Sequence, residues 1–246
     1  MSENLPYIRD KNISNMKIYE QKKVENILKE NRFPGEIDKP YSTSDFYIYF
    51  FYYILPFLKE GSRVGFFTSD TWLNVEYGED FKKFLNMYFK IVAIIDSSVE
   101  RWFEDAEVNT AIIILERYSD KKERENNKIK FVRINKKMSD IVKDINGALK
   151  IAKALENRKP NNDLEITREV AQGSINLNNT MKSKFYLYLR GPDEFFELVN
   201  NKNMVPLDAL MDIKRGFTIG VNEFFYVKDV TDEYKDSEKL KQNFGL

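Results

Sequence analysis

The sequence predicts an α/β fold in which a mostly parallel sheet carries an antiparallel hairpin at its edge. Three runs of consecutive apolar residues, 63–68, 90–96 and 109–115, have the length of strands that are buried on both faces. Segment 79–89 has apolar residues at helical spacing, so it is expected to cross over between the first two strands. A fourth run, 128–134, is separated from the third run, 109–115, only by a charged turn. These two runs are therefore expected to form the antiparallel hairpin at the edge of the sheet.

Local signals predict two helices before the first strand. One is expected to run from Ser44, a good N-cap residue, to Glu60, because Gly61 is a natural C′ residue. Pro56 falls inside this helix and is expected to bend its last turn. The preceding stretch is polar and predicts a long excursion with a short helix at 17–29.

A change of pattern near residue 160 predicts two domains. Segment 136–158 has helical character, and the polar residues 159–162 have the composition of a linker. We therefore expect one domain over 1–160 and the beginning of a smaller one over 161–246, with a short helix after Pro192.

Composition excludes several kinds of chemistry. The 246 residues contain neither cysteine nor histidine, which excludes disulfides, thiolate catalysis, histidine bases and histidine-bound zinc. Lys and Arg total 39, as do Asp and Glu, so the chain is not a globally basic nucleic-acid-binding domain. The most apolar run, 46–58, is too short to cross a bilayer, and a cytoplasmic protein is expected.

The most informative short motif is Asn4-Leu5-Pro6-Tyr7. It resembles the Asn-Pro-Pro-Tyr signature of the DNA amino-methyltransferases that make N6-methyladenine. Because only three residues precede Asn4, no strand is expected to lead into the motif.

Further segments resemble the same family and follow in the family's order, over about residues 1 to 228. They include a helix that ends in a glycine turn, a strand followed by Trp-Leu, an aromatic loop and the start of a target-recognition domain. These segments are Tyr47 to Gly61, Phe66 to Leu73, Tyr77 to Leu85, Ile94 to Asp96, Phe103 to Thr110, and Gly216 to Phe224. The resemblance implies the second half of a Rossmann-like methyltransferase sheet, from a restriction-modification system.

The resemblance also implies a mechanism that needs no histidine or thiol. The adenine is flipped out of the duplex. The lone pair of its amino group is delocalised into the ring and must be freed before the nitrogen attacks the methyl of S-adenosylmethionine (AdoMet). By this resemblance the Asn4 side chain and the Leu5 carbonyl would accept hydrogen bonds from that amino group. Pro6 would shape the turn and Tyr7 would stack on the base.

The remaining candidate residues are assigned to substrate binding. Phe103 would form the second aromatic wall of the base pocket, with core packing as an equal alternative. Arg9 is assigned to a phosphate, with a solvated tail arginine as the alternative. In the recognition domain Lys214, Arg215 and Asn222 are candidates to face DNA, whereas Trp72 is expected to pack in the core. No metal site is expected.

Two departures from the family pattern shape the prediction. Leu5 stands where the family has proline, so the turn is less rigid. The family's glycine-rich cofactor turn lies before its Asn-Pro-Pro-Tyr motif, and here only three residues precede Asn4 and no Gly-x-Gly occurs in the sequence. We therefore expect a chain that lacks the main AdoMet-binding residues, is inactive alone, and pairs with an AdoMet-binding half or covers its open sheet edge by self-association.

Other functions stay open on the sequence alone. The chain is alternatively a non-catalytic DNA-binding or specificity subunit, which its zero net charge and Leu5 favour. It is alternatively a methyltransferase of RNA or of a protein glutamine, or a truncated remnant of a restriction-modification gene that folds as a homodimer.

Overall fold

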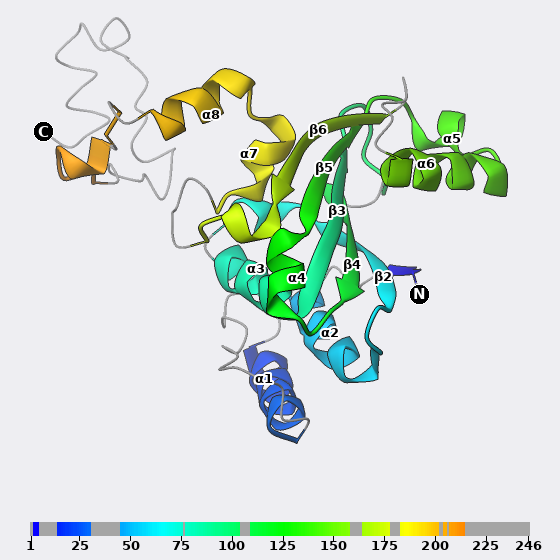
Figure 1. The fold of residues 1–246 in the computed structure, drawn as a ribbon. Helices are drawn as coiled ribbons and strands as arrows, with labels where there is room; N and C mark the ends of the chain where they lie inside the picture. The colour runs from blue at the N-terminus through cyan, green and yellow to red at the C-terminus, as the bar shows by residue number, and fades with distance from the viewer. Residues whose placement is uncertain are drawn as a thin grey trace, which may run out of the picture. The chain divides into compact units, whose positions relative to one another are not determined.

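A computed structural model of the chain contains a six-stranded mixed sheet with helices on both faces (Figure 1). It describes residues 2–4, 14–30, 45–75, 77–103, 109–157, 164–177, 183–201, 204–205 and 207–214. The strands lie in the order β1-β2-β4-β3-β5-β6. Their bounds are Ser2–Asn4 for β1, Arg63–Ser69 for β2, Phe89–Ser97 for β3, Thr110–Arg117 for β4, Lys128–Ile134 for β5 and Leu164–Ala171 for β6.

The strand pairing confirms the α/β class and corrects two details. The short strand β1 runs parallel to β2, so the expectation that no strand leads into the motif is wrong. β4 inserts between β2 and β3 and is antiparallel to both. β5 pairs in parallel with the other side of β3, so β4 and β5 form no hairpin, and the antiparallel edge pair is β5 with β6. The hairpin prediction failed because closeness in sequence does not fix which strands are neighbours.

Eight α-helices are described in the chain. They are α1 (Ser14–Glu30), α2 (Tyr47–Ile54), α3 (Tyr77–Tyr88), α4 (Lys121–Asn126), α5 (Met138–Ile141), α6 (Ile145–Asn157), α7 (Phe185–Arg190) and α8 (Asp193–Asn200). Short 3-10 turns occur at Leu55–Phe57, Thr71–Leu73, Gln172–Ser174 and Leu207–Ala209. The predicted second helix begins later than expected, at Tyr47, and Pro56 turns its end into a 3-10 turn. Gly61 adopts the predicted left-handed conformation, with φ of 76°.

Two apolar layers bury the sheet. On one face Ala93, Ile95, Val132 and Ile134 form a cluster against apolar side chains of α5 and α6. On the other face aromatic rings dominate: Phe51 of α2 contacts Phe66 of β2 and Phe81 of α3 with centroids less than 5 Å apart, at 4.9 and 4.8 Å. The apolar runs were correctly read as doubly buried strands because helices cover both faces.

Trp72 belongs to the aromatic layer, as predicted. Its side chain is fully buried, its ring lies 5.1 Å from that of Phe81, and its indole N–H donates to the Thr68 hydroxyl at 3.1 Å. The burial gives this tryptophan a packing role.

The compact unit extends further than the predicted first domain. It runs from Met1 to Asp193, because β6 joins the sheet and α7 packs against β5 and β6. A second unit comprises residues 194–246, and its described part contains most of α8 and exposed apolar side chains such as Leu198 and Leu210. The structural division therefore falls at Asp193 rather than at 160, and the place where a recognition domain starts stays a prediction.

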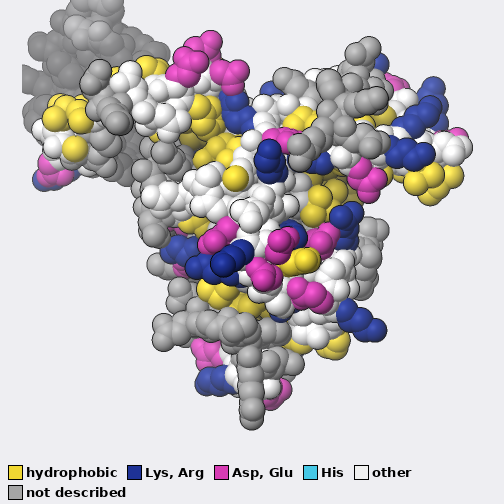
Figure 2. All heavy atoms as spheres, in the orientation of Figure 1, with side chains coloured by type: hydrophobic (Ala, Val, Ile, Leu, Met, Phe, Trp, Pro, Cys, Tyr) yellow, Lys and Arg dark blue, Asp and Glu magenta, His cyan; other side chains and the backbone are white. Residues whose placement is uncertain are grey.

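The charged surface shows the same balance as the composition. On the described part of the face drawn in Figure 2, Lys and Arg side chains are intermixed with Asp and Glu over the middle of the view. No helix within the described ranges is long and apolar enough to cross a membrane.

Candidate active site

The parallel pair of β1 and β2 positions the Asn-Leu-Pro-Tyr motif. Ser2 pairs with Gly65 and Asn4 with Phe67, so Asn4 is the last residue of β1 and lies at the carboxyl edge of the sheet. In open α/β sheets this edge is where ligands bind. The backbone of Asn4 therefore lies at this edge, and the catalytic role of its side chain stays a prediction. Leu5, Pro6, Tyr7 and Arg9 lie outside the described residues.

The structure brings Phe103 to the same edge. The ring of Phe67, the register partner of Asn4, lies 5.5 Å from the ring of Phe103 and 5.8 Å from that of Trp102, both nearly perpendicular. Phe103 is half-buried, between core and solvent. The sequence analysis assigned Asn4 and Phe103, about a hundred residues apart, to one base pocket. In the structure Phe67 pairs with Asn4 through the backbone and contacts Phe103 through its ring. The role of Phe103 as a wall of the base pocket stays a prediction.

A hydroxyl cluster lies just beyond the carboxyl end of β2. The Tyr77 hydroxyl donates to the Asp45 carboxylate at 2.6 Å and lies 3.1 Å from the Thr71 hydroxyl, which is 2.6 Å from that of Ser69. Burial raises the pKa of Tyr77, and the adjacent carboxylate of Asp45 raises it further, so the phenol stays a donor. This cluster was not predicted from the sequence, because its members are separated along the chain.

A second polar network connects α7 to the ends of β2 and β3. Asp96 of β3 is 1% exposed, accepts from Arg190 Nε at 2.8 Å and lies 3.5 Å from Arg133 Nε. Arg190 Nη2 also lies 3.7 Å from Asp70, directly after β2. Burial raises the pKa of Asp96 and of Asp70, while the guanidinium of Arg190 favours both charged forms. This network holds the carboxyl edge together and was not predictable, since 94 residues separate Asp96 from Arg190.

Beside this network is a polar pocket of about 300 Å³. Its lining comes from the end of β3 (Ser97), the following loop (Arg101), the start of β4 (Thr110), Arg133 of β5 and Arg190 of α7. The pocket opens at the same edge as Asn4, because β1, β2 and β3 all end there and β4 begins there.

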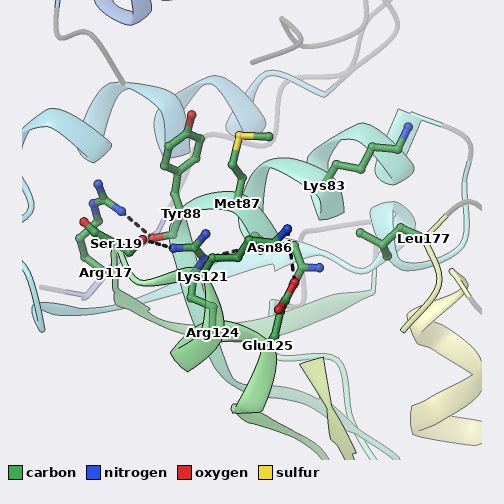
Figure 3. A pocket seen from close by; sticks show the side chains of 10 residues that line it. All are labelled: Lys83, Asn86, Met87, Tyr88, Arg117, Ser119, Lys121, Arg124, Glu125 and Leu177. Atoms are coloured by element: carbon green, nitrogen blue, oxygen red, sulfur yellow. Dashed lines mark hydrogen bonds and ion pairs between the residues drawn. The ribbon is translucent and has the colours of Figure 1, made fainter. Parts of the chain in front are cut away.

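The larger pocket, of about 560 Å³, lies at the opposite edge of the sheet (Figure 3). Its buried arginines bind backbone carbonyls: Arg117 donates to the Tyr88 carbonyl at 2.9 Å, and Arg124 to those of Asn86 and Ser119 at 3.1 and 2.7 Å. Two of these carbonyls, those of Asn86 and Tyr88, belong to the last turn of α3, so the arginines stabilise the end of that helix. Because Arg117 and Arg124 bind backbone carbonyls and lie at the edge opposite Asn4, we interpret this pocket as structural rather than as part of the candidate active site.

The candidates from the second unit are only partly described. Lys214 is exposed and forms an ion pair with Asp212 at 3.0 Å. An ordinary surface ion pair is the alternative to the proposed DNA contact. Arg215 and Asn222 lie outside the described residues. Among the residues that the structure describes, no group of three or more acidic side chains could hold a metal ion.

The order β1-β2-β4-β3, with β4 antiparallel, is a partial Rossmann-like sheet, which is the predicted fold class. Residues 4–103 match the sequence model of the Eco57I restriction-modification methylase family. This match covers about two fifths of the chain and agrees with the family resemblance over that part. No curated protein sequence matches.

Solved structures of restriction enzymes have a similar fold. The type IIG restriction endonuclease BpuSI is 13% identical over 73% of this chain and 19% of its own, with a TM-score of 0.51. The type I restriction-modification methyltransferase subunit from Streptococcus thermophilus is 13% identical over 61% of this chain and 31% of its own, with a TM-score of 0.43. The chain thus spans about a fifth of the first protein and less than a third of the second.

Proposed function

We propose that this chain is the target-base part of a site-specific DNA methyltransferase that acts on the N6 amino group of adenine. Asn4 and the Leu5 carbonyl hold that amino group, and Tyr7 and Phe103 flank the flipped base. The observation that carries the proposal is the parallel pairing of β1 with β2. It puts Asn4 at the carboxyl edge, next to the residue whose ring contacts Phe103.

The chemistry of this arrangement fits a weak nucleophile. The lone pair of an exocyclic adenine amine is delocalised into the ring. Two acceptors that bind its N–H groups draw the nitrogen toward tetrahedral geometry and free the lone pair. An amide oxygen and a backbone carbonyl do this without titrating, so the step needs no histidine, in keeping with the composition.

The residues of this sequence do not fit a complete AdoMet site. AdoMet, the methyl donor implied by the family, needs a close backbone turn, and none of the ten glycines forms a Gly-x-Gly pair. We therefore place the main AdoMet-binding residues on polypeptide outside these 246 residues, either a further segment or a partner subunit. On this proposal the chain alone neither binds AdoMet tightly nor methylates DNA. Tight binding of AdoMet to the pure chain in isothermal titration would contradict this.

Reconstitution tests the function. The chain is combined with an AdoMet-binding methyltransferase half, and transfer of labelled methyl to duplex DNA is measured. Asn4→Ala is expected to abolish transfer while the assembly still forms. Asn126→Ala is the matched control, because Asn126 is exposed at the end of α4, near the opposite edge, and should leave transfer unchanged.

The outcomes separate the competing functions. Methyl transfer that depends on Asn4 supports the proposal, and digestion of the methylated DNA to N6-methyl-2′-deoxyadenosine identifies the atom that is methylated. Equal activity of the Asn4→Ala variant refutes the proposed role of the motif. DNA binding without any transfer favours a non-catalytic specificity subunit.

The partners follow from the same proposal. DNA is the substrate, and Arg9, Lys214, Arg215 and Asn222 are proposed to contact it. Single substitution of these residues should weaken DNA binding without changing methyl transfer at saturating DNA.

A further inference from the structure

The polar pocket at the carboxyl edge has three arginines in its lining, and the carboxylates of Asp96 and Asp70 behind it pair with two of them. We call it the arginine pocket, after Arg101, Arg133 and Arg190. The only carboxylate among its described lining residues is Glu100, which accepts a hydrogen bond from the Met138 amide at 2.5 Å. We propose that the arginine pocket binds a backbone phosphodiester of the DNA strand that carries the target base. The inference rests on the proposed function for its choice of DNA.

The three guanidinium groups differ in how much of their hydrogen bonding is already used. Arg190 is fixed by Asp96, Asp70 and the Tyr186 hydroxyl. Arg133 has one ion pair, from Nε to Asp96 at 3.5 Å, which leaves its two terminal amino groups for a ligand. The buried carboxylate of Asp96 lies against both Arg190 and Arg133 and orients the two side chains at the pocket.

Arg101 is the residue without a structural explanation. It is exposed, lines the pocket, and forms no hydrogen bond or ion pair with any residue that the structure describes. A guanidinium with five donors that serves no fold contact is suited to a phosphate, whose oxygens match its fork geometry. The alternative, that the pocket arginines only neutralise Asp96 and Asp70, accounts for Arg190 and not for Arg101.

The position of the pocket selects the ligand. β1 and β3 are separated by β2 and β4, so Asn4 and Ser97 end strands that are three spacings, or about 14 Å, apart on one edge. One bound strand can therefore reach both places, with the flipped base at Asn4 and a neighbouring phosphate in the pocket. The loop between the pocket and Phe103 spans only Ser98 to Trp102, which connects the two directly.

Salt dependence of DNA binding tests the inference. The full chain is titrated with a labelled DNA duplex in fluorescence anisotropy between 50 and 200 mM salt. Each phosphate contact contributes about 0.9 to the slope of log K against log salt, so a fourfold rise in salt costs about 3.5-fold in affinity per contact. Arg101→Gln should remove one such contact, and Arg101→Lys should restore most of the slope.

The control removes the same charge elsewhere. Arg63→Gln alters an arginine that is 59% exposed at the start of β2, at the opposite edge, and should keep the wild-type slope. Arg133→Gln should lower the slope like Arg101→Gln, with its thermal unfolding followed to show that it folds.

Three results would overturn the inference: an unchanged slope in Arg101→Gln, the same reduction in Arg63→Gln, or no DNA binding by the wild-type chain. Failure of the proposed function gives a different result. In that case the salt slopes respond as expected, while the reconstituted enzyme transfers no methyl group.

Discussion

Lys82 is a charged residue in the aromatic core, and replacing it with methionine should stabilise the protein. Its side chain is 1% exposed, its amine donates to the Leu73 carbonyl at 3.1 Å and lies 5.2 Å from the ring centre of Phe185. Burial lowers its pKa from 10.5 to about 7, and the nearby Lys184 adds to this, while Glu79 opposes it.

The pKa shift sets the magnitude and its pH window. Below pH 7 both the folded and the unfolded chain carry the proton, so the full cost of burying the charge is present. A shift of 10.5 to 7 corresponds to about 5 kcal/mol at about 1.36 kcal/mol per unit. Between pH 7 and 10.5 the unfolded state binds the extra proton, so the free energy of unfolding of the wild type rises with pH. The hydrogen bond to Leu73 and the contact with the Phe185 ring offset about 2 kcal/mol of this burial cost, and methionine loses both interactions. The free energy of unfolding of Lys82→Met at pH 6 should therefore exceed that of the wild type by about 3 kcal/mol.

Urea unfolding at pH 6, 8 and 10 measures this difference. The advantage of Lys82→Met over the wild type should be largest at pH 6 and disappear by pH 10, when the wild-type amine is neutral in the folded state. Lys83→Met is the matched control, because Lys83 is 43% exposed and paired with Asp80, so its effect should stay within about 0.5 kcal/mol. If Lys82→Met is no more stable at pH 6, or if its advantage does not change with pH, the ammonium is solvated in the folded protein and the argument is wrong.

Two substitutions test the packing that builds the carboxyl edge. Gly78→Ala should lower the free energy of unfolding by more than about 2 kcal/mol, because the new Cβ would lie 1.9 Å from the Trp72 carbonyl oxygen. An unfolding temperature close to that of the wild type would show that the two backbone segments are not packed this closely. Asp96→Asn should cost about 3 kcal/mol, since it leaves Arg190 and Arg133 without their buried carboxylate. Urea unfolding measures this loss, and an unchanged midpoint would show that the network does not hold α7 to β3.

Elements whose side chains pack on both faces were predictable, and elements defined by long-range pairing were not. The run 128–134 coincides with β5, because its four apolar residues, at 129, 131, 132 and 134, have the spacing of a buried strand and are all buried. β6 was missed because Leu164–Ala171 mixes apolar with polar and charged residues without a regular period and follows directly on the predicted linker. β1 was missed because three residues are too few to show a period, and its existence depends on β2.

The candidate site divides in the same way. The motif around Asn4 is local, so it could be identified from the sequence, whereas the strand that ends at Asn4 was not expected. The partners of Asp96 could not be found, because an arginine in α7 has no sequence signal that relates it to a strand 94 residues earlier. Local chemistry is thus visible in the sequence, whereas the network that orients it depends on the fold.

The topology explains why Phe103 lies at the same edge of the sheet as Asn4. β3 ends at Ser97 at the carboxyl edge, and β4, being antiparallel, begins at the same edge with Thr110 opposite Ser69. The chain between them therefore leaves and re-enters the sheet at one edge and has no need to cross a face. An aromatic residue in that connection is held over the ends of β2 and β3, and the insertion of β4 between them brings it against Phe67. The antiparallel strand thus turns an ordinary parallel sheet into one whose binding edge carries an aromatic loop, and the proposed base pocket depends on that insertion more than on any single side chain.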